Sequence, residues 1–322
     1  MHRKIKHAAL LAALVSLGLN TPAFAASKKP HGKTQVKASA KAGKTTAAKT
    51  ENVRKKALAA QALSAQTTGQ LALGSASAIV IDQNSGELLL DKSSNQVTPI
   101  ASVTKLMTAM VVLDARLDLN EVITISEDDI DTLKGTRSRL PVGTSMTRET
   151  ALLLALMSSD NRAANALGRH YPGGLRAFVQ AMNRKAHELG MYASHFDEPT
   201  GLSSTNVSTA RDLAKMVAAS AHYPEIRRAS TTAEALLEIH GRVQGFSNTN
   251  ALVKSDSWEI AVSKTGYIAE AGRCLVMQAK VADKPVIIVL LDSNGKMTRV
   301  GDANRIKRWM ENASITRSSR HV

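Results

Sequence analysis

The sequence predicts an α+β domain, in which an antiparallel sheet is flanked by helices and a further helical lobe is inserted between its strands. Short apolar runs bounded by turn residues occur near residue 80 and again between residues 260 and 292, and helical spacing dominates between them. Strands at both ends with helices in the middle are typical of this class. The roughly 240 residues from Leu71 onward are enough for one large domain.

The first elements are a hairpin and a helix. Ser77 to Asp82 and Glu87 to Asp91 are apolar runs joined by Asn84-Ser85-Gly86, which predicts a β-hairpin. Apolar residues then recur with helical spacing just after Ser102, and they predict a helix with one apolar face: Leu106, Met107, Met110, Val111 and Leu113.

Helices and then strands complete the domain. We expect helices at Arg148 to Met157 and Leu175 to Leu189, and a closing helix at Arg299 to Asn312. Late strands are predicted at Ile260 to Ser263, Cys274 to Val281 and Val286 to Asp292, with a turn at Asp283-Lys284-Pro285. Cys274 is the single cysteine, so no intramolecular disulfide is possible, and its apolar neighbours predict a buried strand position.

The N-terminus has the pattern of a secretory signal peptide over residues 1–25. Three basic residues precede an apolar run from Ala8 to Leu19, and Ala23-Phe24-Ala25 forms a small-residue cleavage site. The alternative is an uncleaved membrane anchor, for which the run is too short, because a span needs about 20 residues. We therefore expect export to the periplasm with cleavage after Ala25.

A basic low-complexity linker is predicted over residues 26–70. Residues 26–56 hold ten Lys or Arg and one Glu, a net charge of +9 within the whole-chain +15. This Ala-, Lys- and Thr-rich composition cannot bury enough surface to fold. A solvated linker and an anion-binding arm remain alternatives. Export argues against nucleic acid as the partner of such an arm and favours an anionic envelope surface. The catalytic domain is expected over residues 71–313, followed by a polar tail over 314–322.

Three short motifs carry the chemistry. They are Ser102-Val103-Thr104-Lys105, Ser159-Asp160-Asn161 and Lys264-Thr265-Gly266, in that order. Ser-x-x-Lys recurs at residues 293–296, and Ser-x-Asn recurs at 93–95 and 204–206, whereas Lys-Thr-Gly occurs once. Each motif alone is therefore weak, and the ordered combination is specific.

These residues suit acyl transfer by a serine with a lysine base. Ser102 and Lys105 lie on one face of a helix at spacing i, i+3. Lysine accepts a proton only when neutral, so its pKa must fall; burial, a second cation at Lys264 and the positive end of a helix all act in that direction. The alternative for Lys105 is an exposed helix lysine, which the apolar run from Leu106 disfavours.

The other two motifs suit proton transfer and substrate binding. The Ser159 hydroxyl can relay a proton, and the Asn161 amide can hold both a lysine and a substrate carbonyl. A helix cap is the alternative for this motif. Lys264 and Thr265 offer a cation and a hydroxyl to a substrate carboxylate, and Gly266 allows close backbone approach. Backbone amides of Ser102 and Tyr267 are candidates for the oxyanion hole.

Competing hydrolase chemistries have little support. Nine histidines include no His-x-x-x-His pair, and one cysteine cannot form a zinc cluster. Neither a Gly-x-Ser-x-Gly elbow nor a Gly-rich phosphate loop is present. We expect no metal and no cofactor.

The three motifs are those of penicillin-binding proteins and class A β-lactamases. From Ser75 to Asn312 the chain resembles the serine-type D-Ala-D-Ala peptidases, the low-molecular-mass penicillin-binding proteins. Flanking segments that share this resemblance are residues 98–101, 198–203 and 271–276. The resemblance implies a β-lactamase/transpeptidase-like fold with the active site between sheet and lobe, peptidoglycan stem peptides as substrate and β-lactams as inhibitors. It also implies that Ser102 is acylated with Lys105 as its base.

Within this family the chain is most similar to the endopeptidase branch, which cuts D-alanyl cross-links. This expectation rests on the segment 271–276 and on the few polar residues after Asn312. A carboxypeptidase is the alternative. Arg273 is either a carboxylate contact or an ordinary strand arginine. A β-lactamase would need a glutamate for deacylation, and Glu198 lies suitably, but Leu202 stands where class A enzymes have asparagine. A non-catalytic wall-binding protein would lack a motif residue, and all are present.

Overall fold

The computed structural model describes residues 71–295 and 297–318. The predicted signal peptide, the basic linker and the last four residues of the polar tail therefore lie outside the described residues. Within the described part, no helix has both the length and the apolar character needed to cross a membrane.

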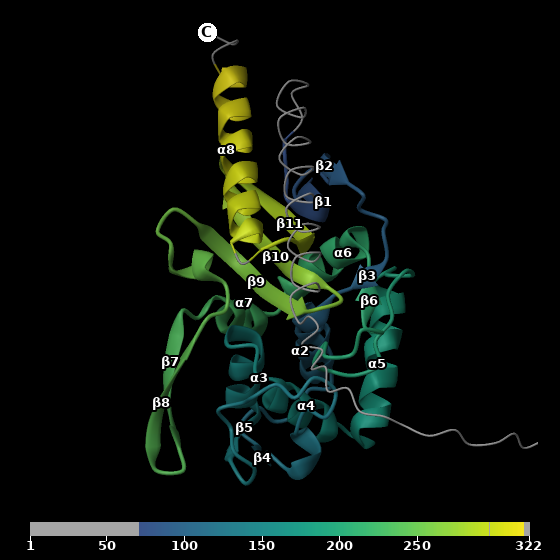
Figure 1. The fold of residues 1–322 in the computed structure, drawn as a ribbon, viewed down its shortest axis with the longest axis vertical. Coiled ribbons are helices and arrows are strands. Elements are labelled where there is room, and N and C mark those ends of the chain that lie inside the picture. The colour runs from purple at the N-terminus through teal and green to yellow at the C-terminus, as the bar shows by residue number, and fades with distance from the viewer. Residues whose placement is uncertain (1–70, 296, 319–322) are drawn as a thin grey trace, which may run out of the picture. The chain divides into compact units, whose positions relative to one another are not determined.

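A five-stranded antiparallel sheet forms one half of the domain (Figure 1). Its order is β2-β1-β11-β10-β9, so the first and last strands of the described residues pair with each other inside the sheet. The strands are β1 (Ser75–Asp82), β2 (Leu88–Lys92), β9 (Glu259–Ile268), β10 (Gly272–Val281) and β11 (Lys284–Ser293). Because β9 is an edge strand, one side of its backbone has no neighbouring strand in the sheet.

The sheet is covered on both faces. Ile79 and Val289 belong to the core shared with the helical lobe, whereas Val80 and Ile288 pack with residues of α8 (Thr298–Ser318) on the other face. Ile79 is paired with Val289 and Val80 with Ile288 across β1 and β11. This period-two alternation is what strands buried on both faces require.

The helical lobe lies between β2 and β9 in the sequence. Its helices are α2 (Lys105–Asp114), α3 (Arg148–Met157), α4 (Asn161–Arg169), α5 (Gly174–Glu188), α6 (Ala210–Ser220) and α7 (Pro224–Thr231). Short 3₁₀ turns are η1 (Ala101–Thr104), η2 (Glu127–Asp129) and η3 (Ala251–Lys254). Three two-stranded pairs complete it: β3 (Thr98–Pro99) with β6 (Val207–Ser208), β4 (Val122–Thr124) with β5 (Ser145–Thr147), and β7 (Glu234–Ile239) with β8 (Arg242–Ser247).

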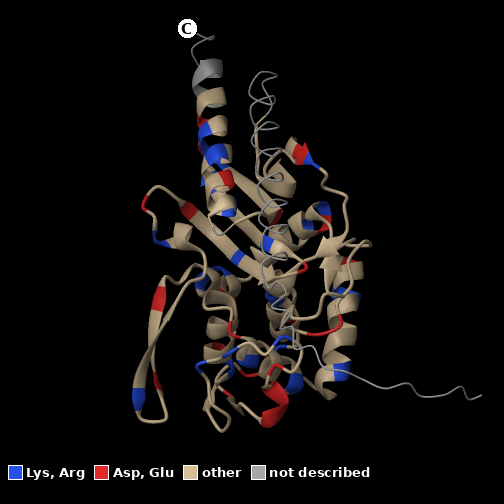
Figure 2. Ribbon diagram, viewed as in Figure 1, with Lys and Arg blue, Asp and Glu red and all other residues tan. Residues whose placement is uncertain are grey.

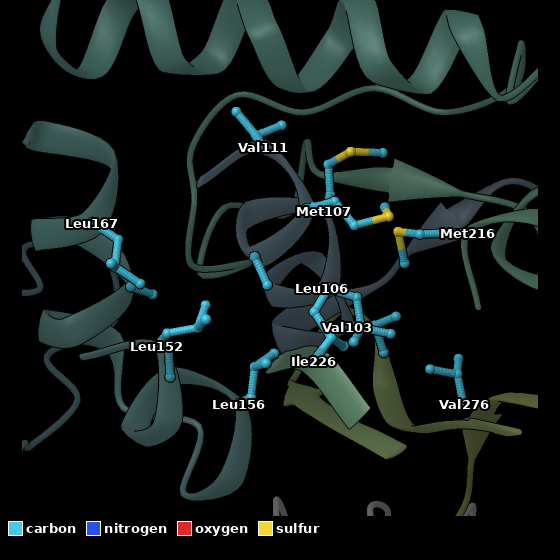
Figure 3. Close-up of a cluster of buried hydrophobic side chains, with 14 of the residues drawn as sticks. Val103, Leu106, Met107, Val111, Leu152, Leu156, Leu167, Met216, Ile226 and Val276 are labelled. Carbon is cyan, nitrogen blue, oxygen red and sulfur yellow. The ribbon is translucent and has the colours of Figure 1, made fainter. Parts of the chain in front are cut away.

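Helix α2 runs through the middle of the core. The predicted helix is confirmed, but burial extends beyond the predicted apolar face, because every residue from Lys105 to Val112 is buried. Figure 3 shows Leu106 and Met107 surrounded by side chains from α3, α4, α6, α7 and the sheet. Packing on all sides fixes the helix that carries Lys105.

Most predicted elements are confirmed, with shifted ends. The first hairpin is β1 and β2, and α3 has the predicted bounds. The last turn is Ala282-Asp283, with both residues at positive φ as in a two-residue hairpin, so the predicted turn at 283–285 is one residue late. Strand β9 continues past Ser263 to Ile268, and α8 extends beyond Asn312. The β7–β8 hairpin was not anticipated.

Charges of both signs are interspersed over the described residues (Figure 2). This distribution agrees with the sequence, because most of the net positive charge precedes residue 57.

Candidate active site

Ser102 and Lys105 are placed by the turn that leads into α2. Ser102 lies in η1, and Lys105 is the first residue of α2. The Lys105 Nζ is 2.9 Å from the Ser102 Oγ, as the i, i+3 spacing predicts. Ala101, just before the serine, has a positive φ of 48°, which costs a non-glycine residue about 1 kcal/mol or more. The surrounding core holds Ser102 in this strained turn.

Lys105 is satisfied in both of its protonation states. Besides Ser102, its Nζ contacts the Asn161 Oδ1 at 2.7 Å and the Thr200 carbonyl oxygen at 2.6 Å. A protonated lysine can donate to all three oxygens. A neutral amine can donate to Asn161 and Thr200 and accept the hydroxyl proton of Ser102. A proton can therefore move from Ser102 to Lys105 without rearrangement of the site.

Burial lowers the pKa of Lys105 to about 8. The side chain has no exposed surface, and desolvation disfavours its charged form. Glu198, Asp160 and Asp131 act in the opposite direction and raise the pKa. Lys105 and Lys264 are both buried and each disfavours the charged form of the other, and the charge of Lys105 lowers the pKa of Lys264.

Ser159 and Lys264 form the second pair of the site. The Lys264 Nζ donates to the Ser159 Oγ at 2.9 Å and to the Thr265 carbonyl at 2.9 Å. Burial, followed by the charges of Lys105 and Arg299, holds the pKa of Lys264 well below its ordinary value. Ser159 has a positive φ of 60° in the tight connection between α3 and α4. The structure thus places the Ser159 hydroxyl against a second buried lysine.

The Ser159-Asp160-Asn161 motif combines a helix cap with two side chains that contact the buried lysines. Asp160 is the N-cap of α4, where its Oδ1 accepts from the Ala163 N–H at 3.0 Å. The alternative proposed for this motif is thus correct for its middle residue. Asn161 begins α4 and turns its amide to Lys105. A cap in the middle position therefore fixes the two flanking side chains.

Two glycines allow the backbone to close around Ser102. A Cβ on Gly266 would lie 2.8 Å from the Ile100 oxygen and 3.2 Å from the Ser102 nitrogen. A Cβ on Gly201, whose φ is 81°, would lie 1.9 Å from the Ala101 oxygen. Strand β9 and the loop at Gly201 therefore pack directly against the serine turn. Lys264, Thr265 and Gly266 lie inside β9 rather than at its end, where the sequence placed them.

Tyr267, Arg273 and Arg299 lie beyond Gly266. The guanidinium of Arg273 lies 4.4 Å from the ring centroid of the exposed Tyr267, a cation–π contact. Arg299 of α8, which sequence reasoning missed, donates to the carbonyls of Gly266 and Cys274, both at 3.1 Å. Burial and the nearby Arg273 lower the pKa of Arg299. No motif marks it, because its partners are backbone atoms.

A match to the family described as D-alanyl-D-alanine carboxypeptidase covers residues 64–295. The chain belongs to this family. It is 49% identical over 249 residues to the D-alanyl-D-alanine endopeptidase of Pseudomonas aeruginosa, covering 77% of this chain and 80% of that protein. It is 46% identical to the protein of the same name from Escherichia coli, covering 80% and 83%.

Solved structures show the same fold for D-alanyl-D-alanine peptidases. The Streptomyces K15 DD-transpeptidase superposes with a TM-score of 0.69 at 29% identity, covering 74% of this chain and 97% of that one. A D-alanyl-D-alanine carboxypeptidase from Mycobacterium tuberculosis gives a TM-score of 0.66 at 28% identity, covering 73% and 90%. The predicted fold class is therefore confirmed.

The carboxylate of Glu198 accepts hydrogen bonds from its own loop in this member of the D-alanyl-D-alanine peptidase family. Its Oε2 accepts from the Thr200 N–H and hydroxyl, and its Oε1 accepts from Gly201, Ser203 and Asn206. With both oxygens used, the carboxylate shapes the segment whose carbonyl contacts Lys105. It makes no hydrogen bond to Ser102 or Lys105 within the described residues, and this arrangement disfavours the β-lactamase alternative.

Proposed function

We infer that the protein is a peptidoglycan DD-endopeptidase that cleaves D-alanyl cross-links through an acyl-enzyme on Ser102 and that penicillins inhibit it. The observation that carries this inference is the Ser102–Lys105–Asn161 network, built around a fully buried lysine. The relatives at 46–49% identity are named endopeptidases, which supports the branch.

Acylation begins with proton transfer from Ser102 to neutral Lys105. The Ser102 Oγ then attacks the D-alanyl carbonyl, and negative charge develops on the carbonyl oxygen. The amides of Ser102 and Tyr267 serve as oxyanion donors, a role supported by the contact of β9 with the serine turn at Gly266. Asn161 and Thr200 hold the protonated lysine with the hydrogen bonds that they made to the neutral one.

Collapse of the tetrahedral intermediate breaks the carbon–nitrogen bond of the cross-link. The departing amine of the second stem peptide needs a proton, and Ser159 can deliver one because its hydroxyl lies against Lys264. The ester on Ser102 is then hydrolysed by water, which restores the serine and releases the first stem peptide with a free carboxylate. Lys105, neutral again once its proton has passed by way of Ser159 to the departing amine, accepts a proton from that water and then returns it to the Ser102 oxygen.

Strand β9 supplies the binding surface for the peptide. Its unpaired edge can accept an extended stem peptide as an additional strand. The Thr265 hydroxyl and the positive charges of Lys264 and Arg299 suit a carboxylate of the substrate. Arg273 lies beside Tyr267 and contributes positive charge farther along the strand.

A D-Ala-D-Ala carboxypeptidase is the second candidate. The family description and relatives at 28–31% identity carry that name. Both activities use the same acyl-enzyme, and they differ in the leaving group, which is a whole stem peptide for the endopeptidase and free D-alanine for the carboxypeptidase.

The test is incubation of the mature protein with cross-linked muropeptide dimers and, separately, with monomeric pentapeptides. We expect dimers to be converted to monomers, and we expect Ser102→Ala and Lys105→Ala to abolish the conversion. Release of D-alanine from pentapeptides while dimers stay intact would assign the protein to the carboxypeptidase branch. The absence of both products would refute the peptidase assignment.

The location and the basic segment are further proposals. The signal-peptide pattern supports export to the periplasm with cleavage after Ala25, and the charge of residues 26–56 supports attachment to an anionic envelope surface. Deleting residues 26–56 should leave the melting temperature and the cleavage of soluble dimers unchanged while weakening binding to sacculi. For the intact protein, that binding should fall as salt is added, because salt screens exposed charges. Unchanged binding after deletion would contradict the proposal.

A further inference from the structure

Both ends of the Asn161 side-chain amide are engaged in the cleft. Its Oδ1 accepts from Lys105 at 2.7 Å, and its Nδ2 donates to the Thr136 Oγ1 at 2.9 Å. The oxygen and nitrogen of an amide have nearly the same shape, so packing alone does not choose between its two orientations. The hydrogen-bond partners must make that choice. Lys105 donates a hydrogen bond to Asn161, so the amide must turn its oxygen, and not its NH₂ group, toward Lys105.

Thr136 fixes the orientation because its only hydroxyl proton is already used. The Thr136 hydroxyl donates to the Asp131 Oδ2 at 2.6 Å. A carboxylate can only accept, so the remaining capacity of the Thr136 oxygen is to accept, and it must face the NH₂ group of Asn161. The carboxylate of Asp131 therefore determines that Asn161 donates to Thr136 and that Lys105 donates to Asn161.

The carboxyl of Asp131 is held in its charged form. Burial opposes ionisation, but hydrogen bonds from Thr136, Lys134 and Leu133 outweigh burial and lower its pKa. Its Oδ1 also accepts the N–H groups of Leu133 and Lys134 at 2.8 and 2.9 Å. Asp131 therefore shapes its own loop and remains an acceptor for Thr136.

We propose that Thr136 and Asp131 are positioning residues for acylation, which fix the Asn161 amide so that its oxygen faces Lys105 and thereby aim the lysine at Ser102. This inference rests on the proposed acyl-enzyme mechanism. Neither residue belongs to the three motifs, and neither contacts Ser102. They act through Asn161 in a hydrogen-bonded chain that runs from Asp131 through Thr136 and Asn161 to Lys105.

The loop that carries Thr136 is held in place without the Thr136 side chain. The backbone N–H of Thr136 donates to Asp131 at 2.8 Å, and Lys134 forms an ion pair of 2.5 Å with Glu270 in the β9–β10 turn. Removing only the Thr136 hydroxyl therefore tests its hydrogen bonds and leaves the loop intact.

The first test compares Thr136→Val, Thr136→Ser and Thr132→Val by the rate at which a labelled penicillin acylates the mature protein. Loss of one hydrogen-bonded partner should slow acylation about tenfold in Thr136→Val. Thr136→Ser should restore most of the rate, because serine keeps the hydroxyl. Thr132→Val is the matched control, since the Thr132 hydroxyl makes no hydrogen bond among the described residues, and its rate should equal that of the wild type. An unchanged rate in Thr136→Val, or a loss that serine does not restore, would overturn the proposal.

The second test uses the pH dependence of acylation in Asp131→Asn. The charged groups around Lys105 are Glu198, Asp160 and Asp131 on the lobe and Lys264 on β9. Removing the charge of Asp131 removes one contribution that raises the pKa of Lys105. The pH of half-maximal acylation should therefore move downward, whereas Thr136→Val should lower the rate and leave that pH in place. A midpoint unchanged in Asp131→Asn would contradict the role of its charge.

Ser102→Ala distinguishes failure of this inference from failure of the proposed function. Wild-type protein that is not acylated at Ser102 would refute the function itself. Wild-type acylation at Ser102 together with full activity of Thr136→Val would overturn only the positioning roles.

Discussion

The loop at Gly201 offers a sharp test of how closely the serine turn is held. We predict that Gly201→Ala will slow acylation by penicillin about a hundredfold. Gly201 has a φ of 81°, and a Cβ there would lie 1.9 Å from the Ala101 oxygen and 2.8 Å from the Ser102 nitrogen. Contacts under 3.0 Å are essentially never observed for a Cβ, so the Ala101 carbonyl must move by roughly 1 Å. That movement is transmitted directly to Ser102.

Gly201→Ala has two effects that must be measured separately: a loss of stability from a side chain at positive φ, and a displacement of the turn that carries Ser102. A non-glycine residue at positive φ loses about 1 kcal/mol wherever it occurs. Gly86, in the β1–β2 turn, has a φ of 71° with nothing within 4 Å of an added Cβ. Gly86→Ala therefore carries the backbone cost alone and should lower stability by about 1 kcal/mol with acylation unchanged. Gly201→Ala carries the same cost and also displaces the serine turn.

Stopped-flow labelling with a fluorescent penicillin gives the acylation rate of each variant, and urea unfolding gives its stability. We expect the acylation rates of the two variants to differ strongly, and we expect Gly201→Ala to lose its rate while it remains folded. Wild-type acylation in Gly201→Ala would refute the inferred contact between this loop and the nucleophile.

Two further predictions concern the pH dependence of acylation and the contribution of the buried Asp302 to stability. Because Lys105 acts when neutral and its pKa is about 8, the acylation rate should rise with pH, reach half its maximum near pH 8 and fall about tenfold for each pH unit well below that value. A flat profile between pH 6 and 9 would argue against Lys105 as the base. Asp302→Asn should destabilise the fold by about 2 kcal/mol in urea unfolding, since this fully buried carboxylate accepts from the N–H and hydroxyl of Ser75 at 2.7 and 2.6 Å. A stability equal to wild type would contradict that role.

The sequence predicted the parts of the fold whose signals are local. Apolar alternation and turn residues located β1 and β2, and helical spacing located α3 with the observed bounds. The end of β9 was missed because Lys264 and Gly266 are residue types depleted in strands. The burial of α2 on all sides depends on the tertiary packing of several helices, which periodicity alone does not reveal.

The three sequence motifs identify the main polar residues of the site, but the sequence does not identify the residues that contact and support them. Asp131 and Thr136 lie in a polar loop far from Asn161 in sequence, and no spacing rule connects them. Arg299 was missed because it binds backbone carbonyls, which leave no mark in a sequence.

The central claim is that Ser102 is the covalent nucleophile and that Lys105 activates it. The most direct measurement is the intact mass and peptide map of the mature protein after brief exposure to penicillin. We predict one acyl group per chain, located on the peptide that contains Ser102, and no adduct in Ser102→Ala. An adduct that maps to another residue, or labelling that survives Ser102→Ala, would contradict the account.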